Sequence, residues 1–139
     1  MKLSVKSDYA CRAIEALALH HPDHRPLRIE EIARAESIPA NYLVQILNEL
    51  KSNGLIQSRR GKAGGYNLAR PPAEITVGDV LRAIHGEVIE LSALAGSASP
   101  LEIQRVWERV KHSMEAVVDG VTFEQFCTAA RRAPQMYYI

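Results

Sequence analysis

Residues 28–69 constrain the fold of this chain more than any other segment, because two short helical patterns and two short strand patterns follow one another there. Residues 28–36 carry apolar side chains at helical spacing, and Ser37-Ile38-Pro39 interrupts that pattern. Pro suits the first turn of a helix, where its missing N–H would be unpaired anyway, and Asn53-Gly54 is a typical helix end. We therefore expect a second helix from Pro39 to about Ser52. Two short helices with a tight break predict a helix-turn-helix.

The second of these helices has two different faces. Its apolar side is formed by Leu43, Ile46, Leu47 and Leu50. Its opposite side is formed by Asn41, Val44, Gln45 and Asn48. Short amide side chains pair with base edges in the major groove of DNA, so this side predicts a reading face. A solvated face without a ligand is the alternative interpretation.

A glycine-rich basic turn joins the two strand patterns. Residues 55–58 and 66–69 alternate as strands do, and the turn between them carries three cations, Arg59, Arg60 and Lys62. These cations suit a phosphate backbone or a minor groove. A nucleotide-phosphate loop is disfavoured, because no helix follows directly and the Gly-Lys-Ser/Thr ending is missing. The segment therefore predicts a mainly α fold with a small β-hairpin wing, a winged helix-turn-helix that binds double-stranded DNA.

A long helix with a heptad stripe follows the predicted wing. Thr76 and Asp79 first begin a helix to about His85, and Ser99-Pro100 begins the long one, which runs to about Asp119. Its apolar positions alternate steps of four and three: Ile103, Trp107, Val110, Met114, Val117 and Val121. Such a stripe favours a symmetric homodimer seam, which would also supply two reading helices. Intramolecular packing of the stripe is the alternative.

The chain ends in an apolar tail, Met136, Tyr137, Tyr138 and Ile139. A short helix precedes it, which we expect to begin at Thr122, turn Phe126 inward and end near Pro134. An apolar side chain beside the terminal carboxylate suits a pocket in another protein, or packs on its own dimer.

We expect three regions: residues 1–75 with the winged helix, 76–121 with the connecting and dimerisation helices, and 122–139 with the last helix and tail. The first helix is expected from Ser7 to about His21.

Several classes of protein are disfavoured by composition. Cys11 and Cys127 match no metal spacing, and no nucleophile–base pair emerges, so we expect neither an enzyme nor a cofactor. No apolar run reaches the length of a membrane span, which predicts a soluble cytoplasmic protein without a membrane partner. Lys and Arg outnumber Asp and Glu in residues 1–70, and the balance reverses in residues 71–139. That asymmetry is consistent with an anionic partner at the basic end.

Short motifs along nearly the whole chain resemble one family of bacterial winged-helix regulators, the Rrf2 family. They are Met1-Lys2-Leu3-Ser4, Tyr9-Ala10, Asn41-Tyr42-Leu43, Asn53-Gly54-Leu55, Arg60-Gly61, Gly64-Gly65-Tyr66, Leu68-Ala69 and Ile75-Thr76-Val77-Gly78-Asp79-Val80. The resemblance implies a homodimer that binds palindromic promoter DNA, usually as a repressor, with Asn41, Tyr42, Gln45 and Arg60 at the DNA. Family members often carry Glu at the position of Val44.

Many members of this family hold an iron–sulfur cluster through three Cys between the helix after the wing and the dimerisation helix. Residues 91–101 contain Ser92, Ser97 and Ser99 but no Cys, so the resemblance implies no cluster here. A cluster-free branch represses cysteine-metabolism genes and ends in an aromatic residue, Tyr and Ile. The branch implies a partner, the enzyme cysteine synthase (O-acetylserine thiol-lyase), whose active site accepts the terminal Ile.

Two alternatives to that reading stay open. The chain could regulate other genes and sense a small molecule, or thiol oxidation at Cys11 or Cys127. It could also be a winged-helix protein-interaction module without DNA binding.

Overall fold

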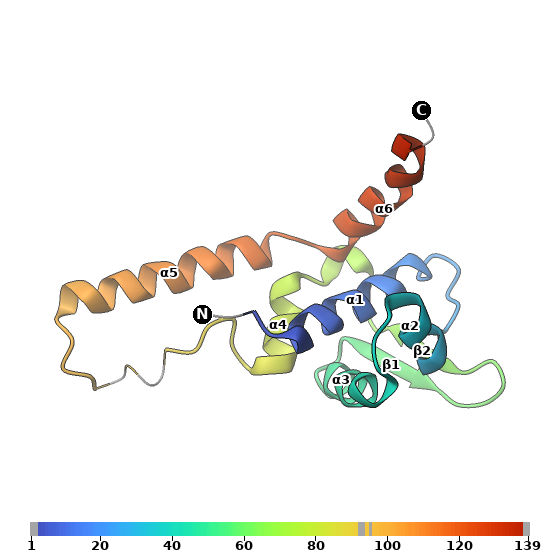
Figure 1. The fold of residues 1–139 in the computed structure, drawn as a ribbon, viewed down its shortest axis with the longest axis horizontal. Coiled ribbons are helices and arrows are strands. Elements are labelled where there is room, and N and C mark those ends of the chain that lie inside the picture. Colours follow the sequence, from blue (N-terminus) through green and yellow to red (C-terminus); the bar gives the residue numbers. More distant parts are fainter. Residues whose placement is uncertain (1–2, 92–93, 95, 138–139) are drawn as a thin grey trace.

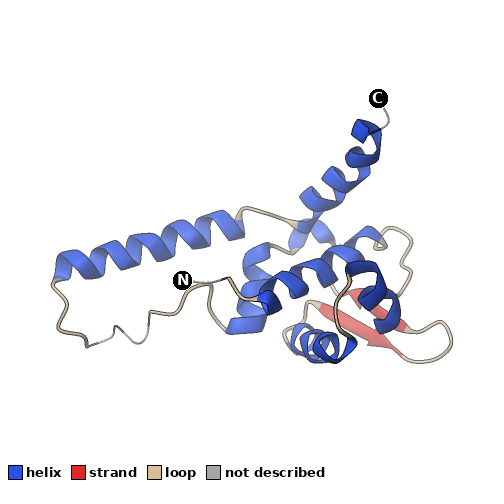
Figure 2. Ribbon diagram, in the orientation of Figure 1, coloured by secondary structure: helices blue, strands red, loops and turns tan. Residues whose placement is uncertain are grey.

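The structure is a computed structural model that describes residues 3–91, 94 and 96–137, with only the helical backbone described for residues 133–137. Within these residues, six α-helices accompany a two-stranded antiparallel sheet (Figure 2). The elements in order are α1 (Val5–Leu19), α2 (Ile29–Glu36), α3 (Ala40–Ser52), β1 (Ile56–Arg59), β2 (Gly65–Leu68), the short 3-10 helix η1 (Pro72–Glu74), α4 (Val77–His85), α5 (Leu101–Asp119) and α6 (Phe123–Tyr137). The predicted mainly α fold with a hairpin wing is confirmed.

One hydrophobic core holds the winged-helix region together, and α1 runs through it. Ile14 of α1, Ile32 of α2 and Val80 of α4 are completely buried. α6 adds the buried side chains of Phe123 and Cys127 to the same core. Sequence reasoning chose Phe126 as the inward residue of α6. It packs at the edge of the core against Phe123, with 5.3 Å between ring centres.

The beginnings of two helices differ from the sequence-based prediction. Ser4 rather than Ser7 caps α1, and its Oγ accepts the Ser7 N–H at 3.1 Å. Ser7 is instead buried, with its hydroxyl 2.6 Å from Nε2 of His85. α5 begins at Leu101, and Pro100 is its N-cap residue, so the predicted Ser99 cap lies outside the helix. The contact of Ser7 with His85 joins residues far apart in the sequence, so spacing alone does not reveal it.

The wing strands lie one residue closer to the turn than expected. Ile56 pairs with Leu68 and Arg59 pairs with Gly65 at the two ends of the ladder. Leu55 still contributes, because its carbonyl accepts the Ala69 N–H at 2.9 Å. The hairpin predicted from the sequence is therefore present, and its ladder extends to the edge of the basic turn.

α5 and α6 project from the core in different directions (Figure 1). α5 is held at its C-terminal end, where Arg82 of α4 forms two hydrogen bonds to the Asp119 carboxylate, at 2.7 and 2.8 Å. These bonds lower the pKa of Asp119. Gly78 lies beneath the pair, and a Cβ there would collide with the Asp119 carboxylate. The chain then turns into α6, which continues to Tyr137 instead of ending near Pro134.

None of the helices within the described ranges is both long and apolar enough to cross a membrane.

Candidate nucleic-acid interface

The turn between α2 and α3 sets the direction of the helix that carries the predicted reading face. Ser37 ends α2 in the left-handed conformation, with φ of 54°. Ile38 is buried, and its N–H donates to the Ala33 carbonyl at 3.0 Å. The sequence suggested that Pro39 is the first residue of this helix. In the structure Pro39 is the N-cap, and α3 begins at Ala40. The predicted helix-turn-helix is present, with its break at these three residues.

α3 presents the two faces that its sequence predicts. Its apolar side chains are completely buried: Leu43, Ile46, Leu47 and Leu50. Its predicted reading face is exposed: Asn41, Val44, Gln45 and Asn48. Among the residues that the structure describes, the three amide side chains of this face form no hydrogen bond. Their donors and acceptors are therefore available to an external partner.

Tyr42 lies at the start of α3 and is braced by an aromatic neighbour. Its ring meets the Tyr9 ring edge to face, with 6.3 Å between their centres, and the Arg12 guanidinium lies 5.5 Å from the centre of the Tyr9 ring. Tyr42 is nevertheless 52% exposed. Sequence reasoning gave Tyr9 no part in the site, yet the contact between α1 and α3 restricts where the Tyr42 hydroxyl can lie.

The wing carries its cations on an exposed turn. Arg59, Arg60 and Lys62 are all exposed, and within the described part of the chain none of them forms a salt bridge. The turn needs glycine at its end: Gly65 has φ of 143°, and a Cβ there would lie 2.6 Å from the Leu27 carbonyl oxygen. The cations are thus displayed without internal neutralisation, which favours an anionic partner.

The wing is fastened to the segment before α2. Leu27 and Tyr66 exchange two backbone hydrogen bonds, at 2.8 and 3.0 Å, and Arg28 donates from Nη2 to the Lys62 carbonyl at 2.6 Å. Sequence reasoning did not find Leu27 and Arg28, because a single bridge between distant segments leaves no periodic pattern. These contacts hold the wing against the helix-turn-helix. α3 and the wing lie along the lower side of the molecule in Figure 1, and α5 lies along its upper side.

The predicted dimer stripe is exposed on α5. Ile103 is 44% exposed, Trp107 42%, Val110 37% and Val117 67%, and no described residue of α5 is fully buried. Met114 is partly buried. Val121 lies beyond the helix end, where its carbonyl accepts the Val77 N–H at 3.0 Å. Five of the six predicted seam residues therefore lie on α5, and the sixth lies in the connection to α6.

The predicted partner-binding tail lies at the limit of the described structure. Met136 and Tyr137 belong to the helical backbone of α6, and Tyr138 and Ile139 lie outside the described residues. α6 leads away from the core toward this end (Figure 1).

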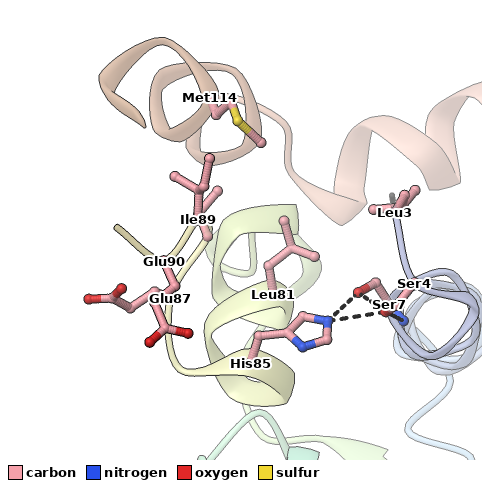
Figure 3. Close-up of a pocket in the computed structure, with 10 residues that line it drawn as sticks. Leu3, Ser4, Ser7, Leu81, His85, Glu87, Ile89, Glu90 and Met114 are labelled. Carbon is pink, nitrogen blue, oxygen red and sulfur yellow. Dashed lines mark hydrogen bonds between the residues drawn. The ribbon is translucent and has the colours of Figure 1, made fainter. Parts of the chain in front are cut away.

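A cavity of about 430 Å³ lies between the start of α1, the end of α4 and the C-terminal half of α5 (Figure 3). Leu81, Ile89 and Met114 form part of its apolar wall. Its polar lining includes Glu87, Glu90 and the imidazole of His85. Nε2 of His85 lies 2.6 Å from Ser7 Oγ and 3.2 Å from Ser4 Oγ. The two hydroxyls are also 2.8 Å apart. Because these groups satisfy one another, they tie α1 to α4 and form no obvious reactive centre.

The two thiols are poor candidates for metal binding or redox chemistry. Cys11 is half-buried, and burial together with the charge of Asp8 raises its pKa to about 11. Cys127 is fully buried, and burial raises its pKa as well. The thiolate is the metal-binding and nucleophilic form, so these raised pKa values disfavour the reactive form of both side chains. Among the described residues no group of three or more His, Cys, Asp or Glu is placed to hold a metal ion. An iron–sulfur cluster needs several thiolates, and the sequence holds two Cys in all and none in residues 91–101, so the thiol donors do not fit such a cluster.

A winged helix-turn-helix with an exposed amide face and a cationic wing defines the winged-helix class of DNA-binding transcriptional regulators. Comparison with known proteins agrees with this class. The Rrf2 family model, described as iron-dependent transcriptional regulator, matches residues 3–129. The chain belongs to the Rrf2 family.

Several individual relatives cover almost the whole chain. The transcriptional regulator CymR of Bacillus subtilis (strain 168) is 30% identical over 141 residues, covering 100% of both chains. The structure of that CymR, titled the global cysteine regulator of B. subtilis, is similar with a TM-score of 0.80 and 28% identity, covering 93% of this chain and 98% of CymR. The structure of T. potens IscR is similar with a TM-score of 0.81 and 34% identity, covering 96% of this chain and 90% of IscR. The resemblance stated from the motifs is confirmed, and these relatives are named as regulators rather than enzymes.

Proposed function

We propose that this chain is a dimeric DNA-binding repressor of cysteine and sulfur metabolism genes, co-regulated by cysteine synthase. The observation that carries the DNA-binding part is the exposed face of α3, together with wing cations that form no salt bridge to any residue the structure describes. In this arrangement α3 enters the major groove, where Asn41, Gln45 and Asn48 meet base edges. Arg59, Arg60 and Lys62 contact the backbone or an adjacent minor groove.

The dimer part of the proposal rests on the apolar stripe of α5. Four of its side chains are more than one third exposed, on a helix whose hydrogen bonds from Arg82 of α4 lie at its C-terminal end. A stripe of this size on a projecting helix marks an interaction surface. A second copy is the occupant that the heptad spacing favours, because two-fold packing of α5 on α5 would bury the stripe on both chains. The same two-fold axis would place two α3 helices on a palindromic operator.

The sulfur part of the proposal rests on three observations. CymR of B. subtilis is similar along the entire chain. The thiol donors for an iron–sulfur cluster are missing from residues 91–101. A signal other than a cluster would therefore have to regulate DNA binding. The chain also ends in Met-Tyr-Tyr-Ile. The active site of cysteine synthase binds an amino-acid carboxylate, so the carboxylate of Ile139 can occupy the same place, and O-acetylserine would compete with it.

DNA binding is tested by titrating the purified full-length chain onto duplexes enriched from its own genome, at several salt concentrations. If the protein contacts phosphates, the logarithm of the association constant should fall linearly with the logarithm of the salt concentration. The absence of duplex binding at low salt, with a folded protein, would contradict the proposal and favour a protein-interaction module.

The tail is tested with purified cysteine synthase from the same organism. The full-length chain should bind the enzyme, and a chain ending at Gln135 should not. A matched control adds one Gly after Ile139, which keeps every side chain but displaces the carboxylate, and it should bind as poorly as the truncated chain. Equal binding by all three proteins would exclude carboxylate capture.

A further inference from the structure

One apolar side chain interrupts the amide face of α3. Val44 is 48% exposed, although Leu43 and Leu47 on the same helix are completely buried. Successive residues of an α-helix are turned by about 100° around its axis. On this basis Val44, Asn48, Asn41 and Gln45 lie within an arc of about 100° on one side of α3. Its methyl groups therefore contribute little to the core and face the same direction as the three amides.

The major groove offers an apolar partner of one kind. Thymine projects its C5-methyl group into this groove, and the remaining base edges there present hydrogen-bond donors and acceptors. Val is β-branched and is held in one preferred rotamer on a helix, so contact with a methyl group costs it little conformational freedom. A cytosine opposite Val44 would instead leave its N4 amino group without an acceptor.

We infer that Val44 is a specificity-determining residue that reads a thymine through its C5-methyl group in each half of the operator. The inference rests on the proposed DNA binding and adds to it the identity of a base. Asn41, Gln45 and Asn48 then read neighbouring positions by hydrogen bonds, and Val44 excludes G·C pairs from its own position.

Uracil substitution tests this contact, since deoxyuridine differs from thymidine only by the missing C5-methyl group. The operator is first selected from random duplexes with the wild-type protein, and each of its thymines is then replaced singly by deoxyuridine. At one thymine in each half-site, we expect wild-type affinity to fall about fourfold, which corresponds to about 0.8 kcal/mol for one apolar carbon. Val44→Ala, which loses two carbons of the contact, should distinguish the thymine and uracil duplexes less than the wild type does at that position.

A matched control comes from the same face of α3. Asn48→Ala should lose affinity overall but keep the thymine preference at the position read by Val44. Both variants lie on the exposed side of the helix, and Ala favours helix, so their unfolding temperatures should match the wild type. Identical uracil profiles for the wild type and Val44→Ala would overturn the inference while operator binding itself persists. A wild-type protein that selects no duplex at all would refute the proposed function and this inference together.

Discussion

Val117→Asp on α5 provides a direct test of the dimer seam. Val117 is 67% exposed in the single chain, so the substitution removes little from the core. Full burial of a Val side chain stabilises by about 1.5–3 kcal/mol, and the exposed two thirds would contribute about 1–2 kcal/mol in each protomer. Over both protomers the loss is about 2–4 kcal/mol, a rise of about 30- to 700-fold in the dimer dissociation constant. Placing two carboxylates in the seam adds to this loss.

Sedimentation velocity over a range of protein concentrations measures this change, and fluorescence anisotropy with the selected operator measures its effect on DNA affinity. His112→Asp is the matched control, because it places the same charge on an exposed position outside the apolar stripe of α5. We expect His112→Asp to remain dimeric and Val117→Asp to become monomeric with weak operator binding. Trp107→Asp should behave as Val117→Asp does. A dimer of unchanged affinity in both seam variants would refute the seam.

Three further predictions concern the wing, the core and a thiol. Arg60→Ala should weaken operator binding by about 1–3 kcal/mol if Arg60 reads a groove, without a change in unfolding temperature; a change confined to unfolding would contradict that role. Leu47→Ala should lower the free energy of unfolding by about 2–5 kcal/mol in denaturant titrations, because it leaves a cavity beneath α3; a value below 1 kcal/mol would show that the site is not tightly packed. Alkylation of Cys11 by iodoacetamide, followed by peptide mass spectrometry, should be slow at pH 7 and rise about tenfold per pH unit to pH 10, because its raised pKa of about 11 keeps the thiol protonated. A rate that levels off near pH 8.5 would contradict that shift.

The helices and the hairpin were predictable because their signals are local. Thr76 and Asp79 form the reciprocal cap that their spacing predicts, with both hydrogen bonds at 3.0 Å. Gly54 and Gly86 end their helices with positive φ, as expected of glycine. The two faces of α3 also followed from spacing alone, since apolar and polar side chains recur on opposite sides at helical spacing.

The features that sequence reasoning missed depend on contacts between distant residues. Ser4 and Ser7 are equally good caps by composition, and the buried contact between the Ser7 hydroxyl and the imidazole of His85, which is far away in the sequence, has no local signal. The bridge from Leu27 to Tyr66 consists of one pair of backbone hydrogen bonds, and no periodic pattern in the sequence predicts it. α6 continues past Pro134 although Pro usually ends a helix, so a local rule alone misplaced its end.

The attachment of α5 has a mechanical consequence. The helix is 19 residues long, or about 28 Å at 1.5 Å per residue, and its described ion pairs to α4 join Arg82 to Glu115 and Asp119 near one end. α5 can therefore rotate about its attachment next to Gly78. A side chain at position 78 would collide with the Asp119 carboxylate, so only glycine fits there. A rotation of about 5° at this pivot carries the far end through about 2.5 Å. In the proposed dimer, a rotation of this kind would change the distance between the two α3 helices, although Gly78 lies on neither α3 nor the wing.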